Sequence, residues 1–123
     1  MQDATNRTGP AFDVPPGVVL KDATVNVVDI NPVLQSFLVT CGLVHMHLFN
    51  QLLTVTSGKD GVHSPGSKHG KGDALDLRIV SLPPIDQPAF ILVLRVLCAR
   101  FGLAMFDETF TPGAGHVHIE IAG

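Results

Sequence analysis

Apolar side chains recur along the chain at two different spacings, one typical of helices and one typical of strands. Over residues 32–49 and 88–101 they recur every three or four positions, which predicts a helix in each range. Asn31 can cap the free N–H groups at the start of the first helix, and Pro32 suits its first position because a missing N–H costs nothing there. Gly102 would end the second helix.

The other apolar segments are too short for helices and predict strands. Residues 52–56 are apolar and β-branched, whereas residues 74–80 and 116–121 alternate between apolar and polar positions. Further short strands are expected at residues 18–20, 24–28 and 103–106. These elements predict an α+β fold, in which about two helices pack on one face of a small antiparallel or mixed sheet.

One domain is expected after an extended N-terminal arm. Residues 1–17 are rich in polar residues, Pro and Gly and form the arm, and residues 18–123 form the domain. The start of the chain lacks a basic segment followed by an apolar one, so we expect no secretory signal and synthesis in the cytoplasm. Neither long apolar stretch reaches the roughly 20 uninterrupted apolar residues of a membrane span.

Composition and charge exclude several kinds of partner. A formal net charge of −3, without a basic patch, argues against nucleic acid and against a membrane surface. We expect a monomer.

The cysteines, Cys41 and Cys98, lie in apolar runs and are interpreted as buried hydrophobic residues, while the sequence leaves a disulfide between them open.

The last predicted strand carries its polar residues on one face. Successive residues of a strand point to opposite faces, so His116, His118 and Glu120 share one face, which suits a metal site or a solvated outer face. A second His-x-His pair, His45 and His47, lies in a predicted helix. Residues two apart in a helix point about 200° from each other, so these two are interpreted as ordinary helix-face histidines.

A long glycine-rich loop, residues 57–73, precedes the strand at 74–80, and long loops in small domains usually have a function. The loop contains His69, and the strand contains Asp76. The glycines allow the backbone to fold His69 back over the strand. With His118 from the last strand, these residues would offer three nitrogen and oxygen ligands, and catalytic zinc sites use three ligands and leave a fourth position for water.

Two motifs resemble one family of metallopeptidases. Residues 67–76 fit the SxHxxGxAxD pattern of zinc D-alanyl-D-alanine carboxypeptidases, and His116-Val117-His118 fits the HxH that closes the same site. The grouping also includes phage L-alanyl-D-glutamate endopeptidases and the signalling domain of sonic hedgehog. The resemblance implies one zinc ion (Zn²⁺) per chain, held on the sheet by His69, Asp76 and His118.

The resemblance also implies catalytic roles for residues around the zinc. His116 would help to hold the water or the developing oxyanion. The general base would be an acidic residue shortly before the HxH, for which Glu108 and Asp107 are the candidates, with Glu120 as a fallback. The stretch between these candidates and His116 is longer than the family pattern.

The chain departs from the family at a second place, where carboxypeptidases carry an Arg shortly after a Ser-Gly. The sequence here is Ser57-Gly58-Lys59-Asp60, so Lys59, His63 or His116 would substitute for the Arg. Lys59 and His63 are expected to face the substrate, although His63 also fits a solvated loop. Supporting positions around the ligands are expected for Ser67, Glu120 and Arg78, with Arg78 paired to a carboxylate.

The function that this resemblance implies is zinc-dependent hydrolysis of peptidoglycan stem peptide bonds, by a D,D-carboxypeptidase or an endopeptidase. Such a protein would be encoded by a phage or a bacterium and would act on the cell wall after release. The alternative is a hedgehog-like zinc-binding module without activity that binds a protein or cell-wall partner. An α+β domain with scattered histidines would explain the composition without any metal.

Overall fold

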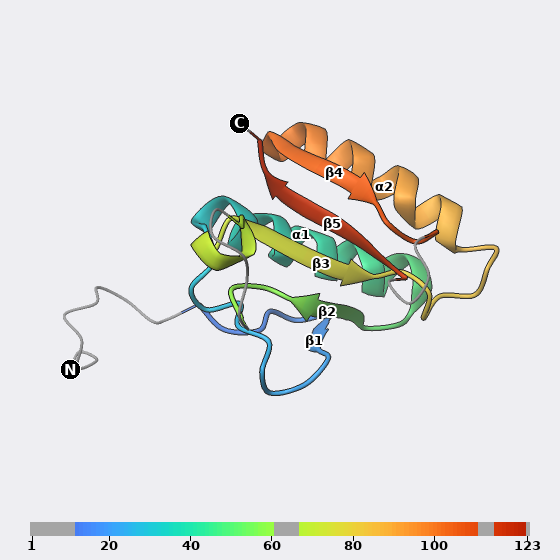
Figure 1. Cartoon of the computed structure of the whole chain (residues 1–123). Coiled ribbons are helices and arrows are strands. Elements are labelled where there is room, and N and C mark those ends of the chain that lie inside the picture. The colour runs from blue at the N-terminus through green and yellow to red at the C-terminus, as the bar shows by residue number, and fades with distance from the viewer. Residues whose placement is uncertain (1–11, 61–66, 111–114, 123) are drawn as a thin grey trace.

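The computed structural model describes residues 12–60, 67–110 and 115–122, and within them it shows two helices and a five-stranded mixed sheet (Figure 1). The α+β fold predicted from the sequence is therefore confirmed. The elements in chain order are β1 (Val18–Leu20), α1 (Pro32–Phe49), β2 (Leu53–Ser57), the 3₁₀ turn η1 (His69–Lys71), β3 (Ala74–Arg78), α2 (Gln87–Phe101), β4 (Leu103–Asp107) and β5 (His116–Ile121).

The strands lie in the order β1-β2-β3-β5-β4, so the last strand of the chain is inserted between β3 and β4. β1 pairs with β2 in parallel, and every other pairing in this sheet is antiparallel. The register of β3 and β5 places Asp76 opposite His118 and Arg78 opposite His116. The Asp of one predicted motif therefore lies directly beside the HxH of the other.

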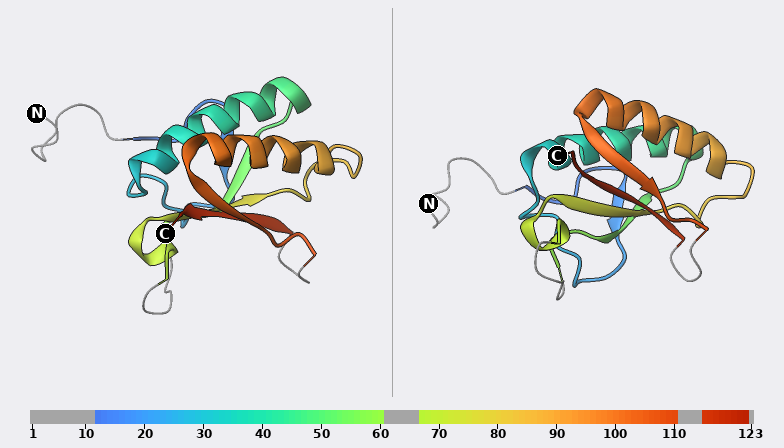
Figure 2. Two further views of the ribbon diagram at one scale, coloured as in Figure 1. Left: turned by 90° about the horizontal axis from the view of Figure 1, so that it is seen from above. Right: turned by 45° about the horizontal axis from the view of Figure 1, so that its top comes forward.

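Both helices pack on the same face of the sheet, as Figure 2 shows. The strand residues that point toward the helices are fully buried, including Leu75 and Leu77 of β3 and Val117 and Ile119 of β5. Burying one such side chain contributes about 1.5–3 kcal/mol to folding. The residues between them point to the opposite face of the sheet and are partly exposed.

Helix α1 begins and ends as its sequence predicts. The side chain of Asn31 accepts a hydrogen bond from the N–H of Val33, Pro32 is the first helical residue, and Asn50 ends the helix with a left-handed φ of 51°. The helix is long and apolar enough to meet the criteria for a membrane span. In this fold, however, it is a core helix, because Leu34 and Phe37 are fully buried in the main hydrophobic cluster.

The histidines and the cysteine of α1 do not belong to the possible metal-ligand groups found among the described residues. His45 is 2% exposed, its Nδ1 lies 2.6 Å from the carbonyl oxygen of Gln51, and burial lowers its pKa. His47 is exposed. Cys41 is free and buried, as is Cys98 of α2, and burial raises the pKa of both thiols.

The strand predicted at residues 24–28 is wrong. Val25 and Val27 are buried, but Asn26 between them accepts hydrogen bonds at its side-chain oxygen from the N–H groups of Val28 and Asp29. These local bonds form a turn that replaces a strand ladder. Valines at alternate positions can be buried in a loop as well as in a strand, so this pattern alone does not identify a strand.

Part of the predicted N-terminal arm packs against the domain. Residues 1–11 lie outside the described residues, but Phe12 packs against the hydrophobic core. Gly17 has a φ of +86°, and a Cβ at this position would lie 2.3 Å from the carbonyl oxygen of Gly42 in α1. Gly17 also accepts a hydrogen bond from the N–H of Leu53. The close approach of these two glycines brings the start of β1 onto α1.

Candidate metal centre

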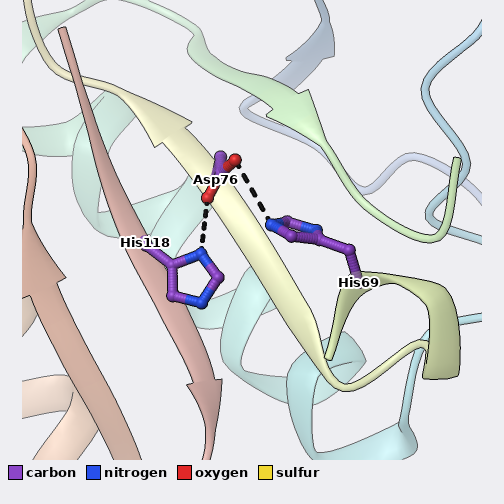
Figure 3. Close-up of side chains that lie close together, drawn as sticks. All are labelled: His69, Asp76 and His118. Atoms are coloured by element: carbon purple, nitrogen blue, oxygen red, sulfur yellow. Dashed lines mark hydrogen bonds and ion pairs between the residues drawn. The ribbon is translucent and has the colours of Figure 1, made fainter. Parts of the chain in front are cut away.

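Three side chains from three elements meet on the face of the sheet opposite the helices (Figure 3). His118 Nδ1 is 2.9 Å from Asp76 Oδ1, and His69 Nε2 is 3.3 Å from Asp76 Oδ2. One ligand atom from each of the three residues can be chosen so that all lie within 4.8 Å of one another. This His/Asp/His group could hold a metal ion, and it consists of the three residues that the sequence motifs predict as ligands.

The sheet itself positions two of these side chains. Asp76 and His118 are register partners on the antiparallel strands β3 and β5, so both point to the same face at the same height. The helix-facing neighbours of both residues are fully buried. A shift of either strand by one residue would expose those core residues, so the hydrophobic core fixes the position of this Asp/His pair.

The turn η1 positions the third side chain, His69. Gly72 ends this turn with a φ of +79°, and its N–H donates to the carbonyl oxygen of His69. A Cβ at Gly72 would lie 2.6 Å from the carbonyl oxygen of Asp29, so the position has room only for glycine. The spacing between His69 and Gly72 therefore has a local cause, because the glycine allows the turn that brings His69 over β3.

Each imidazole has a second hydrogen bond that leaves its other nitrogen directed at Asp76. His69 Nδ1 lies 3.0 Å from the carbonyl oxygen of Gly58, to which it donates, and its Nε2 is directed at the carboxylate. His118 Nε2 lies 2.9 Å from Glu120 Oε1, and its Nδ1 is directed at the carboxylate. Such outer partners orient metal-binding histidines and select the nitrogen that binds the metal.

The carboxylate of Asp76 is coupled to both imidazoles. Burial lowers the pKa of His69, but the hydrogen bond and charge of Asp76 outweigh burial and leave that pKa raised. The hydrogen bond to Asp76, helped by Glu120, raises the pKa of His118 to about 9 against the effect of burial. For Asp76, burial raises the pKa, but the hydrogen bonds from both imidazoles and the nearby positive charges hold it well below its usual range. A metal ion would therefore compete with protons for these imidazole nitrogens.

A carboxylate–imidazole pair lies beside the three residues. His116 Nε2 is 2.6 Å from Glu108 Oε1 and 3.8 Å from Asp76 Oδ2. The neighbouring acid, Asp107, lies opposite Val117 in the register, and its carboxylate accepts from the N–H and hydroxyl of Thr109. The geometry thus separates the two predicted base candidates, because Glu108 faces the metal centre and Asp107 closes a local turn.

Of the other residues predicted for the site, some lie beside the three possible ligands and others do not. Glu120 contacts His118, as described above, and Ser67 lies partly buried two residues before His69. Arg78 is on the same strand face as Asp76, yet among the described residues no carboxylate lies within ion-pair distance of its guanidinium. Lys59 is exposed, and its side chain runs past Gly72. His63 lies outside the described residues.

Three contacts of the centre were missed by the sequence analysis. Lys68 Nζ is 3.8 Å from Glu120 Oε2 and donates to the carbonyl oxygen of Ile121. Gly58 contributes only its carbonyl oxygen, which leaves no signal in the sequence. Phe106 lies opposite His118 in β4, is 50% exposed, and has its ring centroid 6.0 Å from the imidazole. The alternation of β4 could have placed Phe106 on this face.

Comparison of the chain with models of protein families and with curated proteins found no match.

Proposed function

We propose that this chain is a zinc-dependent peptidase that hydrolyses stem peptide bonds of peptidoglycan, either as a D,D-carboxypeptidase or as an endopeptidase. The observation that carries the proposal is the convergence of His69, Asp76 and His118 on the side of the sheet opposite the helices, with Glu108 and His116 beside them. The peptidoglycan substrate and the phage or bacterial origin come from the motif resemblance alone.

The donor set fits zinc. Two imidazole nitrogens and one carboxylate oxygen are typical ligands of this ion, and three protein ligands leave a position open, as in catalytic zinc sites. Both imidazoles have the outer hydrogen bonds that such ligands usually make. When bound, zinc would polarise a peptide carbonyl and lower the pKa of a water molecule toward 7.

Glu108 and His116 suit the proton transfers that peptide hydrolysis needs. The Glu108 side chain is 43% exposed, so water and substrate can reach its carboxylate. In the proposed reaction Glu108 accepts a proton from water and delivers it to the leaving amine. His116 would orient the carboxylate through their 2.6 Å contact and could donate a hydrogen bond to the carbonyl oxygen as that oxygen becomes negative.

Replacing Glu108 tests the proposed reaction. In Glu108→Gln the side chain keeps its shape but loses the base, so hydrolysis should fall about 10²–10⁴-fold while zinc remains bound. Asp107→Asn is the matched control, because this adjacent carboxylate closes a turn away from the centre and its loss should leave hydrolysis within a few-fold of wild type.

The assay is a digest of purified peptidoglycan by the zinc-loaded protein, with fragments identified by mass spectrometry. Loss of terminal D-Ala would identify a carboxypeptidase, whereas cleaved stem peptides or cross-links would identify an endopeptidase. A chelator should stop either reaction. Unchanged hydrolysis in Glu108→Gln would remove Glu108 from the mechanism, and no fragments from any wall type would remove the peptidase.

One observation favours the alternative, a zinc-binding module without activity. Phe106 is half exposed on the same sheet face as the metal centre, and a protein partner could bury its ring. On this alternative a zinc-loaded protein would bind peptidoglycan or a protein without releasing fragments, and Phe106→Ser would weaken that binding while zinc content stayed the same.

A further inference from the structure

A second group of metal-ligand side chains lies beside the first. Donor atoms of Asp76, Glu108 and His116 lie within 4.8 Å of one another. His116 Nε2 is 2.6 Å from Glu108 Oε1 and 3.8 Å from Asp76 Oδ2. The donors of one tetrahedral zinc ion, each about 2.1 Å from the metal, are about 3.4 Å apart. Small side-chain rotations would therefore bring these three donors to the spacing that one ion needs.

Asp76 belongs to both groups, and its Oδ2 lies near one imidazole of each. Its Oδ1 lies 2.9 Å from His118 Nδ1, whereas its Oδ2 lies closest to His69 Nε2, at 3.3 Å, and to His116 Nε2, at 3.8 Å. A carboxylate in such a position can bridge two ions, and ions in two-metal hydrolytic sites are about 3.5–4 Å apart.

We infer that Asp76, Glu108 and His116 form a second zinc site, which shares Asp76 with the first, and that excess zinc bound there inhibits the protein. Inhibition follows because an ion on Glu108 would occupy the carboxylate that is needed as the base, so this part of the inference rests on the proposed function. The binding of the second ion does not depend on that function.

The second site is the weaker one for two reasons. The Glu108 side chain is 43% exposed, whereas that of Asp76 is 15% exposed, so Glu108 loses more rotamer freedom when it binds an ion. A first zinc ion also keeps a net positive charge after it binds one carboxylate, and this charge repels a second cation nearby. The sites should therefore fill in sequence as the zinc concentration rises.

The test is a calorimetric titration of the metal-free chain with Zn²⁺ alone. Wild type should show two binding events. Glu108→Gln and His116→Asn should each weaken the second event at least about tenfold, because even the loss of an outer partner of a metal ligand costs about 10–100-fold. The first event should persist in both, which also shows that these variants are folded. His47→Asn, which alters an exposed histidine on α1, should keep both events.

The results separate the two proposals. A single event in wild type, or a second event unaffected by both substitutions, would overturn the second site even if the chain hydrolyses peptidoglycan. Two events from a chain that hydrolyses nothing would uphold the second site and overturn the peptidase. If both proposals hold, hydrolysis should be half-inhibited at the zinc concentration that half-fills the second site.

Discussion

At the scale of single residues, the metal centre is organised by hydrogen bonds to the far nitrogens of its two imidazoles. The carbonyl oxygen of Gly58 binds His69, and the carboxylate of Glu120 binds His118. These contacts orient both rings toward Asp76. The ligands therefore lose little further freedom when an ion binds, which strengthens its binding.

Glu120 offers a test of this orientation. In Glu120→Gln the amide can still contact His118 but no longer supplies a charge that makes the imidazole a stronger ligand. We expect zinc affinity to fall about 10–100-fold, as measured by competition with a chelator of known affinity. His47→Ala should leave the affinity unchanged. Equal affinities for wild type and Glu120→Gln would show that Glu120 does not support the metal ligand.

The metal-free chain should lose stability as pH rises above neutrality. The pKa of His118 is raised from 6.5 to about 9, so its contribution is full below about pH 6.5 and is lost as pH rises through 9. Asp76 has a lowered pKa, so its contribution is lost only as pH falls, well below this window. The free energy of unfolding should fall by up to about 2 kcal/mol, allowing for screening of the partly exposed ring.

Urea denaturation in the presence of a chelator, at several pH values between about 6 and 9, measures this loss. His118→Gln should be less stable than wild type near pH 6 and should show a flatter pH dependence, because it lacks the titrating group. A wild-type stability that is flat over this range would contradict the charge coupling between His118 and Asp76.

At the scale of elements, the periodic parts of the structure were predictable and the irregular parts were not. The range of α1 and that of β5 agree with prediction because apolar spacing and end signals act locally. The turn η1 had no such signal. It forms because Gly72 lies against the backbone of Asp29, a contact between distant parts of the chain. Residues 24–28 misled the prediction because burial, not strand pairing, explains their valines.

Two glycines that end helical turns should respond differently to alanine. Gly72 and Gly102 have similar φ values, +79° and +72°, but a Cβ at Gly72 would lie 2.6 Å from the Asp29 carbonyl oxygen, whereas one at Gly102 would meet nothing within 4 Å. Gly102→Ala should lower the free energy of unfolding by only about 1 kcal/mol, the cost of a left-handed backbone conformation for alanine. Gly72→Ala should cost more than about 2 kcal/mol and should also weaken zinc binding, because η1 carries His69.

Urea denaturation of both variants, together with their zinc affinities, checks this comparison. Equal losses of stability would show that the contact between Gly72 and Asp29 does not constrain the turn. Unchanged zinc affinity in a folded Gly72→Ala protein would show that η1 does not position His69.

In the whole molecule, the hydrophobic core and the candidate metal centre lie on opposite faces of the sheet. The helices cover one face of the sheet (Figure 2), and the candidate metal centre lies on the other face (Figure 3). His118 is far from His69 and Asp76 in the sequence, and the insertion of β5 between β3 and β4 brings His118 beside Asp76. The motifs predicted which side chains would meet, but not this strand order, which depends on packing of the complete core. The candidate centre should therefore exist only in the folded chain, so the binding of a metal ion there would be linked to folding.

The most direct test of the account is the zinc content of the purified protein. After growth with zinc and removal of loosely bound metal by dialysis, elemental analysis should find about one zinc per chain in wild type and in His47→Ala. Asp76→Asn and His118→Ala should hold far less while remaining folded by circular dichroism. Well under one zinc per chain in folded wild type, or full zinc content in both ligand variants, would contradict the assignment of His69, Asp76 and His118 as the metal centre.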